Sequence, residues 1–202
     1  MENQINPVIA EAIENFRKGK KLKTYVIMVS RTYPAYHHRK GQPTYFVEKI
    51  QLALNMLVQV PDYLLIDLDP KIHTFRGNFP LWKKRIDEVL SGNAVIVLKY
   101  HTLGRYVKGN KQIEFVRLDK DSGVGVQEFL FGYESASFPT LITGERVITA
   151  TMVGLNEVSE NDGLLSNDFK EWFEKGDYDM NEAFACIHFT SFRYGRTLPT
   201  PK

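Results

Sequence analysis

The chain of 202 residues contains 43% hydrophobic and 12% aromatic residues, enough to bury a core, so an intrinsically disordered protein is excluded. Its net charge of +2 combines two opposite segments: residues 17–49 hold nine Lys or Arg and one acid, whereas residues 145–182 hold ten acids and three bases. The single cysteine, Cys186, excludes an intramolecular disulfide and a cysteine-based zinc site, and the lack of a long apolar run predicts a cytoplasmic protein with no membrane partner.

The first half of the chain predicts helices alternating with strands. Pro7 after Asn6 is typical of a helix start, and Thr44 precedes apolar residues spaced as on one helix face. The β-branched residues of TYVIMVS favour a strand. The expected elements, in chain order, are an N-terminal helix and strand within 6–30 (the strand at 24–30), a loop at 31–43, a helix from Thr44, an apolar insertion at about 58–69 and a helix at 81–92.

Short β-strands dominate the second half. A short acidic helix at 166–174, with Ser166 as its cap, interrupts them. Short strands joined by glycine-containing turns, with a few helices outside, indicate an α+β fold, namely a small mixed β-barrel with flanking helices in a single domain over residues 1–202. The expected strands are 94–100, 111–118, 124–131, 146–153 and 184–192.

The stretch KIHTFR at 71–76 places Lys71, His73, Thr74 and Arg76 together just before a turn. It fits either an exposed edge strand with alternating polar residues or a site for an anionic or nucleotide-like ligand. In a regular strand Lys71 and Thr74 would point to opposite faces, so joint action of the two needs a bulge or a turn between them.

Three motifs occur in one order: PTYFVEKI at 43–50, KIHTFR at 71–76 and NDGLLSNDF at 161–169. In this order they resemble the ASCH domain family of the PUA-like superfamily, whose hallmark is a K-x-x-T-x-R element. The resemblance covers about residues 40–193. It implies a compact PUA-like β-barrel with flanking helices, whose cleft holds the K-x-x-T element and binds RNA or a nucleotide.

Some small bacterial members of this family resemble amidohydrolases that remove an acyl group from N4-acetylcytidine and related nucleosides. By that resemblance, the catalytic residues here are Lys71, Thr74 and Asp162. The family carboxylate is a glutamate, one methylene longer than Asp162, and Glu160 is a second candidate for its place.

The residue types fit the hydrolysis of an amide. Thr74 can act as the nucleophile, with Lys71 as its base if burial lowers the pKa of the lysine. Asp162 can orient the lysine or hold the substrate amine. Arg76, or backbone N–H groups near Gly77, can stabilise the oxyanion.

Further residues are candidates for substrate binding. His73 and Arg76 share the KIHTFR stretch, Tyr45 can stack on a base, and Arg39 and Lys40 can contact phosphate. We expect no metal site, because the adjacent His37 and His38 chelate poorly and no third ligand lies at a useful spacing. No cofactor is expected either, since GVG at 123–125 lacks the dinucleotide-binding glycine pattern.

Three functions are open from the sequence. The protein is a module that binds RNA or a modified nucleotide through a basic cleft around Lys71–Arg76, or an amidohydrolase of N4-acetylcytidine-like nucleosides. The third possibility is a non-catalytic interaction domain. Close approach of Lys71, Thr74 and Asp162 in one cleft would favour the enzyme over the other two.

Overall fold

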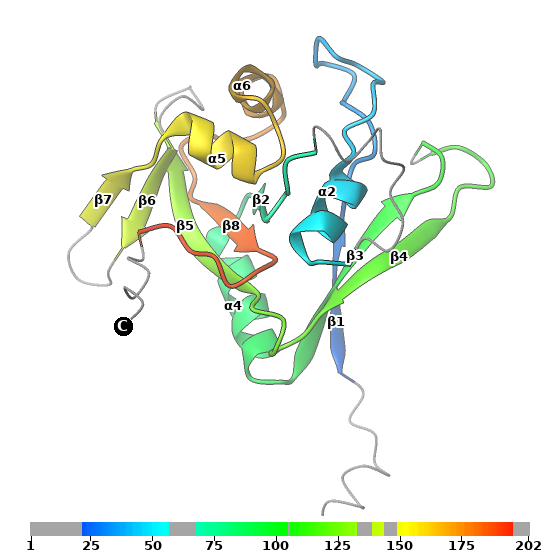
Figure 1. Ribbon diagram of the computed structural model, residues 1–202. Helices are drawn as coiled ribbons and strands as arrows, with labels where there is room; N and C mark the ends of the chain where they lie inside the picture. The colour runs from blue at the N-terminus through cyan, green and yellow to red at the C-terminus, as the bar shows by residue number, and fades with distance from the viewer. Residues whose placement is uncertain (1–21, 57–67, 105, 133–138, 144–148, 196–202) are drawn as a thin grey trace, which may run out of the picture.

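The computed structural model describes residues 22–56, 68–104, 106–132, 139–143 and 149–195 (Figure 1). Within these ranges the protein is mixed α+β, with four helices and with eight strands arranged in two sheets. The helix expected from residue 6 and most of the insertion at 58–69 lie outside the described residues. None of the described helices has both the length and the apolar character needed to cross a membrane.

One sheet has three strands, β1 (Lys23–Met28), β3 (Ala94–His101) and β4 (Gln112–Leu118). The central strand β3 pairs in parallel with β1 and antiparallel with β4. Its first five residues, AVIVL, are all buried, as expected for an apolar run covered on both faces. The strands expected at 24–30, 94–100 and 111–118 are therefore confirmed, with ends that differ by at most two residues.

The other sheet is antiparallel, with the order β2-β8-β5-β6-β7. Its strands are β2 (His73–Arg76), β5 (Gly125–Phe131), β6 (Pro139–Thr143), β7 (Thr149–Met152) and β8 (Phe184–His188). The expected strand at 184–192 ends early, at His188, and β6 was not expected. Among the described strands none pairs across the two sheets, so these residues form two sheets, and the PUA-like barrel expected from the sequence is not confirmed.

Four helices flank the sheets: α2 (Phe46–Ala53), α4 (Phe79–Leu90), α5 (Leu155–Asn161) and α6 (Ser166–Glu174). Helix α4 packs against β3, β5 and β8, and so joins the two sheets. It begins earlier than expected because the side chain of Asn78 accepts a hydrogen bond from Leu81 N–H at 3.1 Å and caps it.

Two of the expected helix caps differ in the structure. Helix α2 is preceded by Tyr45 in the left-handed region (φ 55°), while the Thr44 hydroxyl donates to Ser30 O at 2.8 Å. Ser166 is the first residue of α6 rather than its cap, and its hydroxyl donates to Asn156 Oδ1 at 2.6 Å. The Thr44 hydroxyl oxygen also accepts a hydrogen bond from Phe46 N–H at 3.4 Å, so Thr44 ties the start of α2 to Ser30, whereas the Ser166 hydroxyl ties α6 to Asn156.

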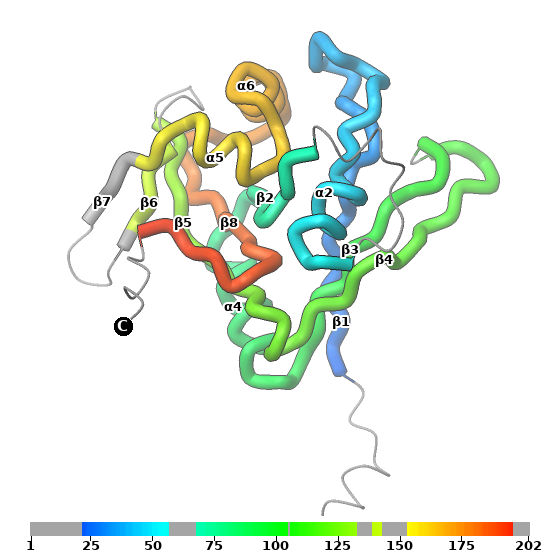
Figure 2. The backbone as a smooth tube through the Cα atoms, in the orientation of Figure 1, coloured from blue at the N-terminus to red at the C-terminus, as the bar shows by residue number. Residues whose placement is uncertain are grey.

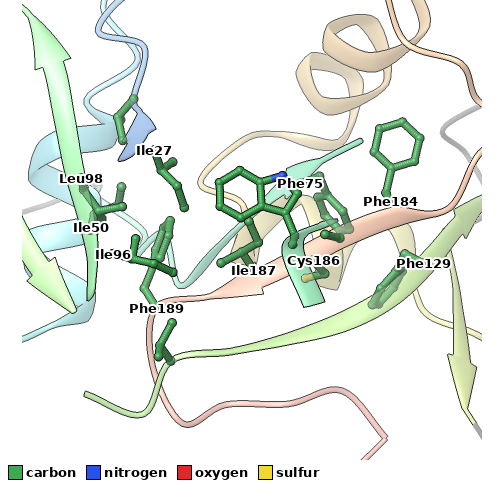
Figure 3. Packing of buried hydrophobic residues seen from close by; sticks show 14 of the residues in the cluster. Ile27, Ile50, Phe75, Ile96, Leu98, Phe129, Phe184, Cys186, Ile187 and Phe189 are labelled. Carbon is green, nitrogen blue, oxygen red and sulfur yellow. The ribbon is translucent and has the colours of Figure 1, made fainter. Parts of the chain in front are cut away.

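The core lies between the two sheets and beneath the helices, as Figure 3 shows for Phe75, Phe184 and Phe189 on one side and Ile27 and Ile96 on the other. Phe75 of β2 makes edge contacts with several other aromatic rings of the core. Strand β2 is thus an edge strand in its pairing, but its side chains are covered. The exposed edge strand considered from the sequence does not occur. Cys186 is fully buried in the same core, as expected, and burial raises the pKa of its thiol.

Candidate functional site

The candidate site is built around the segment that leads into β2. The two residues before the strand, Lys71 and Ile72, donate their backbone N–H groups to Lys49 O (3.1 Å) and Asn161 O (2.9 Å). These bonds hold the segment between α2 and the end of α5. Because Lys71 precedes the regular strand, the alternation of strand side chains does not separate it from Thr74, and both residues line one pocket.

A buried ion pair lies at the centre of this pocket. Lys71 Nζ donates to Asp162 Oδ1 and to the backbone oxygen of Asp162, each at 2.6 Å. The two residues are only 2% and 4% exposed. Loss of hydration lowers the pKa of Lys71, while the charge of Asp162 opposes that shift. In this pocket Lys71 therefore reaches its neutral form, which can accept a proton, more easily than a lysine in water does.

Local backbone geometry explains how Asp162 reaches the lysine. Asp162 is the C-cap of α5, and Gly163 after it has φ +74°, which reverses the chain towards α6. A Cβ atom on Gly163 would lie 3.1 Å from Lys71 Cβ, so glycine allows the close approach. Glu160, the second candidate carboxylate, is exposed on α5 and does not line the pocket.

Behind the carboxylate lies a chain of buried polar groups. His73 Nδ1 is 3.4 Å from Asp162 Oδ1, and His73 Nε2 is 2.7 Å from Tyr194 Oη. Asn161 Nδ2 donates to the same Tyr194 oxygen at 2.9 Å, so the tyrosine proton is directed to His73 Nε2. Burial lowers the pKa of His73, which favours the neutral ring with its proton on Nδ1, facing Asp162. His73 is fully buried and supports Asp162 from behind rather than lining the pocket.

The pocket itself is narrow, with a volume of about 40 Å³. Thr74 lines it and is 9% exposed, and the part of the chain that the structure describes offers its hydroxyl no hydrogen-bond partner. Arg76 also lines the pocket, with one guanidinium nitrogen donating to Met28 O at 2.7 Å. Aromatic rings, among them Phe46 and Trp172, make up much of the remaining wall.

The other residues expected to bind substrate lie away from this pocket. Tyr45 is 39% exposed but does not line it. Arg39 donates to Asp168 Oδ2 at 2.7 Å and its guanidinium lies over the ring of Tyr33, 4.5 Å from the ring centroid, so it is engaged within the protein. Lys40 is exposed on the loop 31–44. Thus the structure brings Lys71, Thr74, Arg76 and Asp162 together and separates them from these three residues.

Two histidines of the loop 31–44 meet acidic residues of α6, some 130 positions further along the chain. His37 Nε2 lies 3.8 Å from Asp168 Oδ1 and 3.9 Å from Glu171 Oε2. His38 Nε2 lies 3.6 Å from Asp168 Oδ1, and its other ring nitrogen contacts Glu171. Together His37, His38 and Asp168 have the spacing of a candidate metal cluster. Asp168, which the fold brings close to the two histidines, is the third potential ligand that could not be recognised in the sequence.

The hydrogen bonds of His37 argue for an ionic cluster rather than a metal centre. Arg39 N–H donates to His37 Nδ1 at 3.1 Å, so the proton of the neutral ring is on Nε2, which lies 3.2 Å from Asp168 O. A metal ligand at Nε2 would need that nitrogen deprotonated. Lys175 and His38 lower the pKa of Glu171 to about 2, so Glu171 is ionised at neutral pH. The cluster therefore fastens the loop to α6.

No protein-family model, no curated protein and no solved structure matches this chain. The class of site is therefore defined by its own geometry: a buried Lys–Asp pair beside a threonine in a narrow pocket. Tyr194 belongs to the same site through its contacts with His73 and Asn161, but no motif singled it out in the sequence, because the contact between residues 73 and 194 depends on the fold.

Proposed function

We propose that the protein is an amidohydrolase that removes an acyl group from N4-acetylcytidine or a related modified nucleoside. The observation that carries the proposal is the 2.6 Å contact between Lys71 Nζ and Asp162 Oδ1 in a pocket that Thr74 also lines. The resemblance of the three sequence motifs to the ASCH family, with its PUA-like barrel, supports the same function. The structure contributes the convergence of the three residues that this chemistry needs.

The proposed reaction uses the three residues in two stages. Thr74 Oγ1 attacks the acyl carbonyl carbon while its proton passes to neutral Lys71 Nζ. Lys71 then gives the proton to the departing N4 nitrogen as the C–N bond breaks, which leaves an acyl ester on Thr74. Lys71 next takes a proton from water, and the resulting hydroxide attacks the ester carbonyl. Lys71 returns that proton to Thr74 Oγ1 as the bond between Oγ1 and the acyl carbon breaks, so the carboxylic acid leaves and both residues regain their starting state. Asp162 holds Lys71 in place, and Arg76 is the cation available to the oxyanion.

The size of the pocket limits what can enter it. A volume of about 40 Å³ holds a small substituent or a few waters, whereas pockets that enclose a whole nucleoside-sized ligand have volumes of roughly 300 Å³ or more. We therefore assign the narrow pocket to the acyl group of the substrate. The base and the sugar lie outside it.

The burial of the residues around the pocket argues against the binding of RNA through a basic cleft at Lys71–Arg76. Lys71, His73 and Thr74 are each at most 9% exposed, so they offer little surface to a phosphate backbone. Such burial favours chemistry on a small group over contact with a charged strand at these positions. A non-catalytic interaction domain is the third candidate, and it predicts that changes in the pocket alter no reaction.

The test is the hydrolysis of N4-acetylcytidine, followed by chromatography of released cytidine. We expect turnover by the wild type and a loss on the order of 10³-fold or more in Thr74→Val, which keeps the shape of the side chain but removes the nucleophile. Thr24→Val, on an exposed position of β1, is the matched control and should keep full activity. Turnover that survives Thr74→Val, or a folded wild type that hydrolyses no N4-acylated cytidine, would contradict the proposal.

A further inference from the structure

A second, larger cavity lies beside the candidate pocket. It is formed by the end of β1 with the segment that follows, residues 28–32, by Pro43, and by the β3–β4 hairpin through His101–Gly104, Tyr106 and Gln112. Its volume is about 860 Å³, within the range of ligand-binding cavities. Figure 2 shows the loop 31–44 standing between α6 and the tip of this hairpin. We call this space the hairpin cavity.

The hairpin cavity and the candidate pocket share a wall. Met28, Val29 and Ser30 line both, and Arg76 of the candidate pocket donates to Met28 O at 2.7 Å across that wall. When the small reactive group of a ligand enters the candidate pocket, the rest of the ligand can lie in the adjacent hairpin cavity. The two volumes, about 40 and 860 Å³, match a small acyl group and a much larger remainder.

The tip of the hairpin exposes apolar and aromatic side chains. Tyr106 is 90% exposed, Val107 52% and Leu103 49%. Hairpin tips that only face water are usually polar, so a run of exposed apolar groups beside a cavity indicates a binding surface. An exposed tyrosine ring is the kind of platform on which the bases of a single strand stack.

The charge of the hairpin points to an anionic ligand. Lys108 and Lys111 are exposed near its tip, and the Arg31 guanidinium lies over the Tyr100 ring, 5.1 Å from the ring centroid, at the cavity wall. In residues 99–117 the only acidic residue is Glu114, and it is paired with Arg117 at 2.9 Å. An exposed ring close to exposed lysines is typical of proteins that bind single-stranded nucleic acid.

We propose that the hairpin cavity binds single-stranded RNA, and that the candidate pocket also processes a nucleotide that is part of such a strand. The identity of the processed nucleotide rests on the proposed function, whereas the binding of the strand to the hairpin does not. Tyr106 stacks on a flanking base, and Lys108 and Lys111 contact phosphates. This places the basic binding surface on the hairpin, not at Lys71–Arg76.

The experiment measures the fluorescence anisotropy of a labelled ten-nucleotide single-stranded RNA of mixed sequence, titrated at 50 and 200 mM salt. The first variant is Lys108→Ser with Lys111→Ser, and its matched control is Lys83→Ser with Lys84→Ser, two exposed lysines of α4. We expect the hairpin variant to bind about tenfold more weakly and to lose about 1.4 from the slope of log affinity against log salt. The α4 control should stay within about twofold of the wild type.

A second pair of variants tests the aromatic contact. Tyr106→Ala should weaken binding about tenfold, and Tyr106→Trp should keep it, because only the latter retains a ring for stacking. Thermal unfolding midpoints equal to that of the wild type will show that these exposed substitutions leave the fold intact.

The outcomes separate this inference from the proposed function. If the wild type binds RNA but the hairpin variants bind as tightly as it does, or if the wild type binds no RNA at 50 mM salt, the inference is overturned. Neither result affects the proposed function, because the hydrolysis of free N4-acetylcytidine is tested separately by comparing the wild type with Thr74→Val. Equal affinity for a polyglutamate peptide of matched charge would also overturn it, because a peptide offers no bases to stack.

Discussion

His73 Nδ1 lies 3.4 Å from Asp162 Oδ1, the same oxygen to which Lys71 donates at 2.6 Å. One carboxylate oxygen thus faces a cationic donor on one side and a neutral, buried ring on the other. Because burial lowers the pKa of His73, the cation in direct contact with Asp162 is Lys71, while Lys49 and Arg76 act on the carboxylate from further away. The stability of the site and its chemistry therefore depend on the same ion pair.

Removal of one partner of this pair should destabilise the protein strongly. Lys71→Met leaves Asp162 buried without its cation, and Asp162→Leu leaves the lysine unpaired; each should cost about 3–5 kcal/mol in the free energy of unfolding. The double variant should be less destabilised than the sum of the two, because no lone charge is left. Urea denaturation of the four proteins measures this, and simple additivity would show that the two side chains do not interact.

The stability of the fold should decrease as the pH falls from 7 to 5. Burial lowers the pKa of His188 to about 2, far below its value in the unfolded chain. In the unfolded chain His188 therefore binds a proton near pH 6.5, whereas in the folded protein it stays neutral at that pH. The contribution of His188 to the free energy of unfolding is fully present above pH 6.5. It decreases by about 1.4 kcal/mol per pH unit as the pH falls from there towards 2.

The variant His188→Leu should flatten this dependence between pH 7 and 5, where most carboxylates of the protein do not yet titrate. His38→Gln, at an exposed position, is the control for a histidine on the surface. Denaturant unfolding at five pH values gives the slopes. An unchanged slope in His188→Leu would mean that this histidine titrates alike in both states.

Gly163→Ala should damage the candidate site more than other substitutions of a glycine with positive φ. Gly163 (φ +74°) and Gly41 (φ +77°) share the backbone conformation, but only at Gly163 would a Cβ atom meet Lys71, at 3.1 Å. Gly41→Ala should cost about 1 kcal/mol from the backbone alone. Gly163→Ala should cost more and should also lower the hydrolysis of N4-acetylcytidine, and equal effects of the two would contradict the role of the close contact.

The loop 31–44 should loosen when Asp168 is replaced by Asn. The substitution removes the charge that Arg39, His37 and His38 face, so hydrogen exchange of the loop amides should accelerate while that of β3 stays constant. Addition of zinc should leave the unfolding temperature of the wild type unchanged, because the proton of His37 is on the nitrogen that faces the acids. A rise in that temperature that depends on Asp168 would identify a metal site instead.

Local patterns predicted the elements better than their assembly. The apolar run before Lys99 and the acidic stretch that begins at Ser166 identified β3 and α6 within about a residue. Strand β2 was ambiguous because polar residues on an edge strand suggest exposure, whereas here long-range packing buries them. The arrangement of the described strands in two sheets depends on which strands pair, and residue alternation does not encode that choice.

The candidate site was predicted in part. Lys71, Thr74 and Asp162 were named from the resemblance of their motifs to the ASCH family, and the structure brings them to one pocket. The positions of Arg39 and Tyr45 could not be predicted from the sequence. Ion pairs with α6 fix the loop that carries Arg39, and such long-range contacts leave no local pattern. Tyr194 was missed because a lone tyrosine near the end of the sequence has no pattern around it.

Strand β8, although it is the last of the described strands, lies inside its sheet between β2 and β5. Its neighbour Phe189 donates a backbone hydrogen bond to Ile72 O at 2.8 Å, next to Lys71. During synthesis on the ribosome, strands β2 and β5 must wait for more than fifty further residues before their shared partner emerges. These pairings therefore form only after residue 189 has been translated, and the unpaired edges of β2 and β5 need protection from aggregation during that interval.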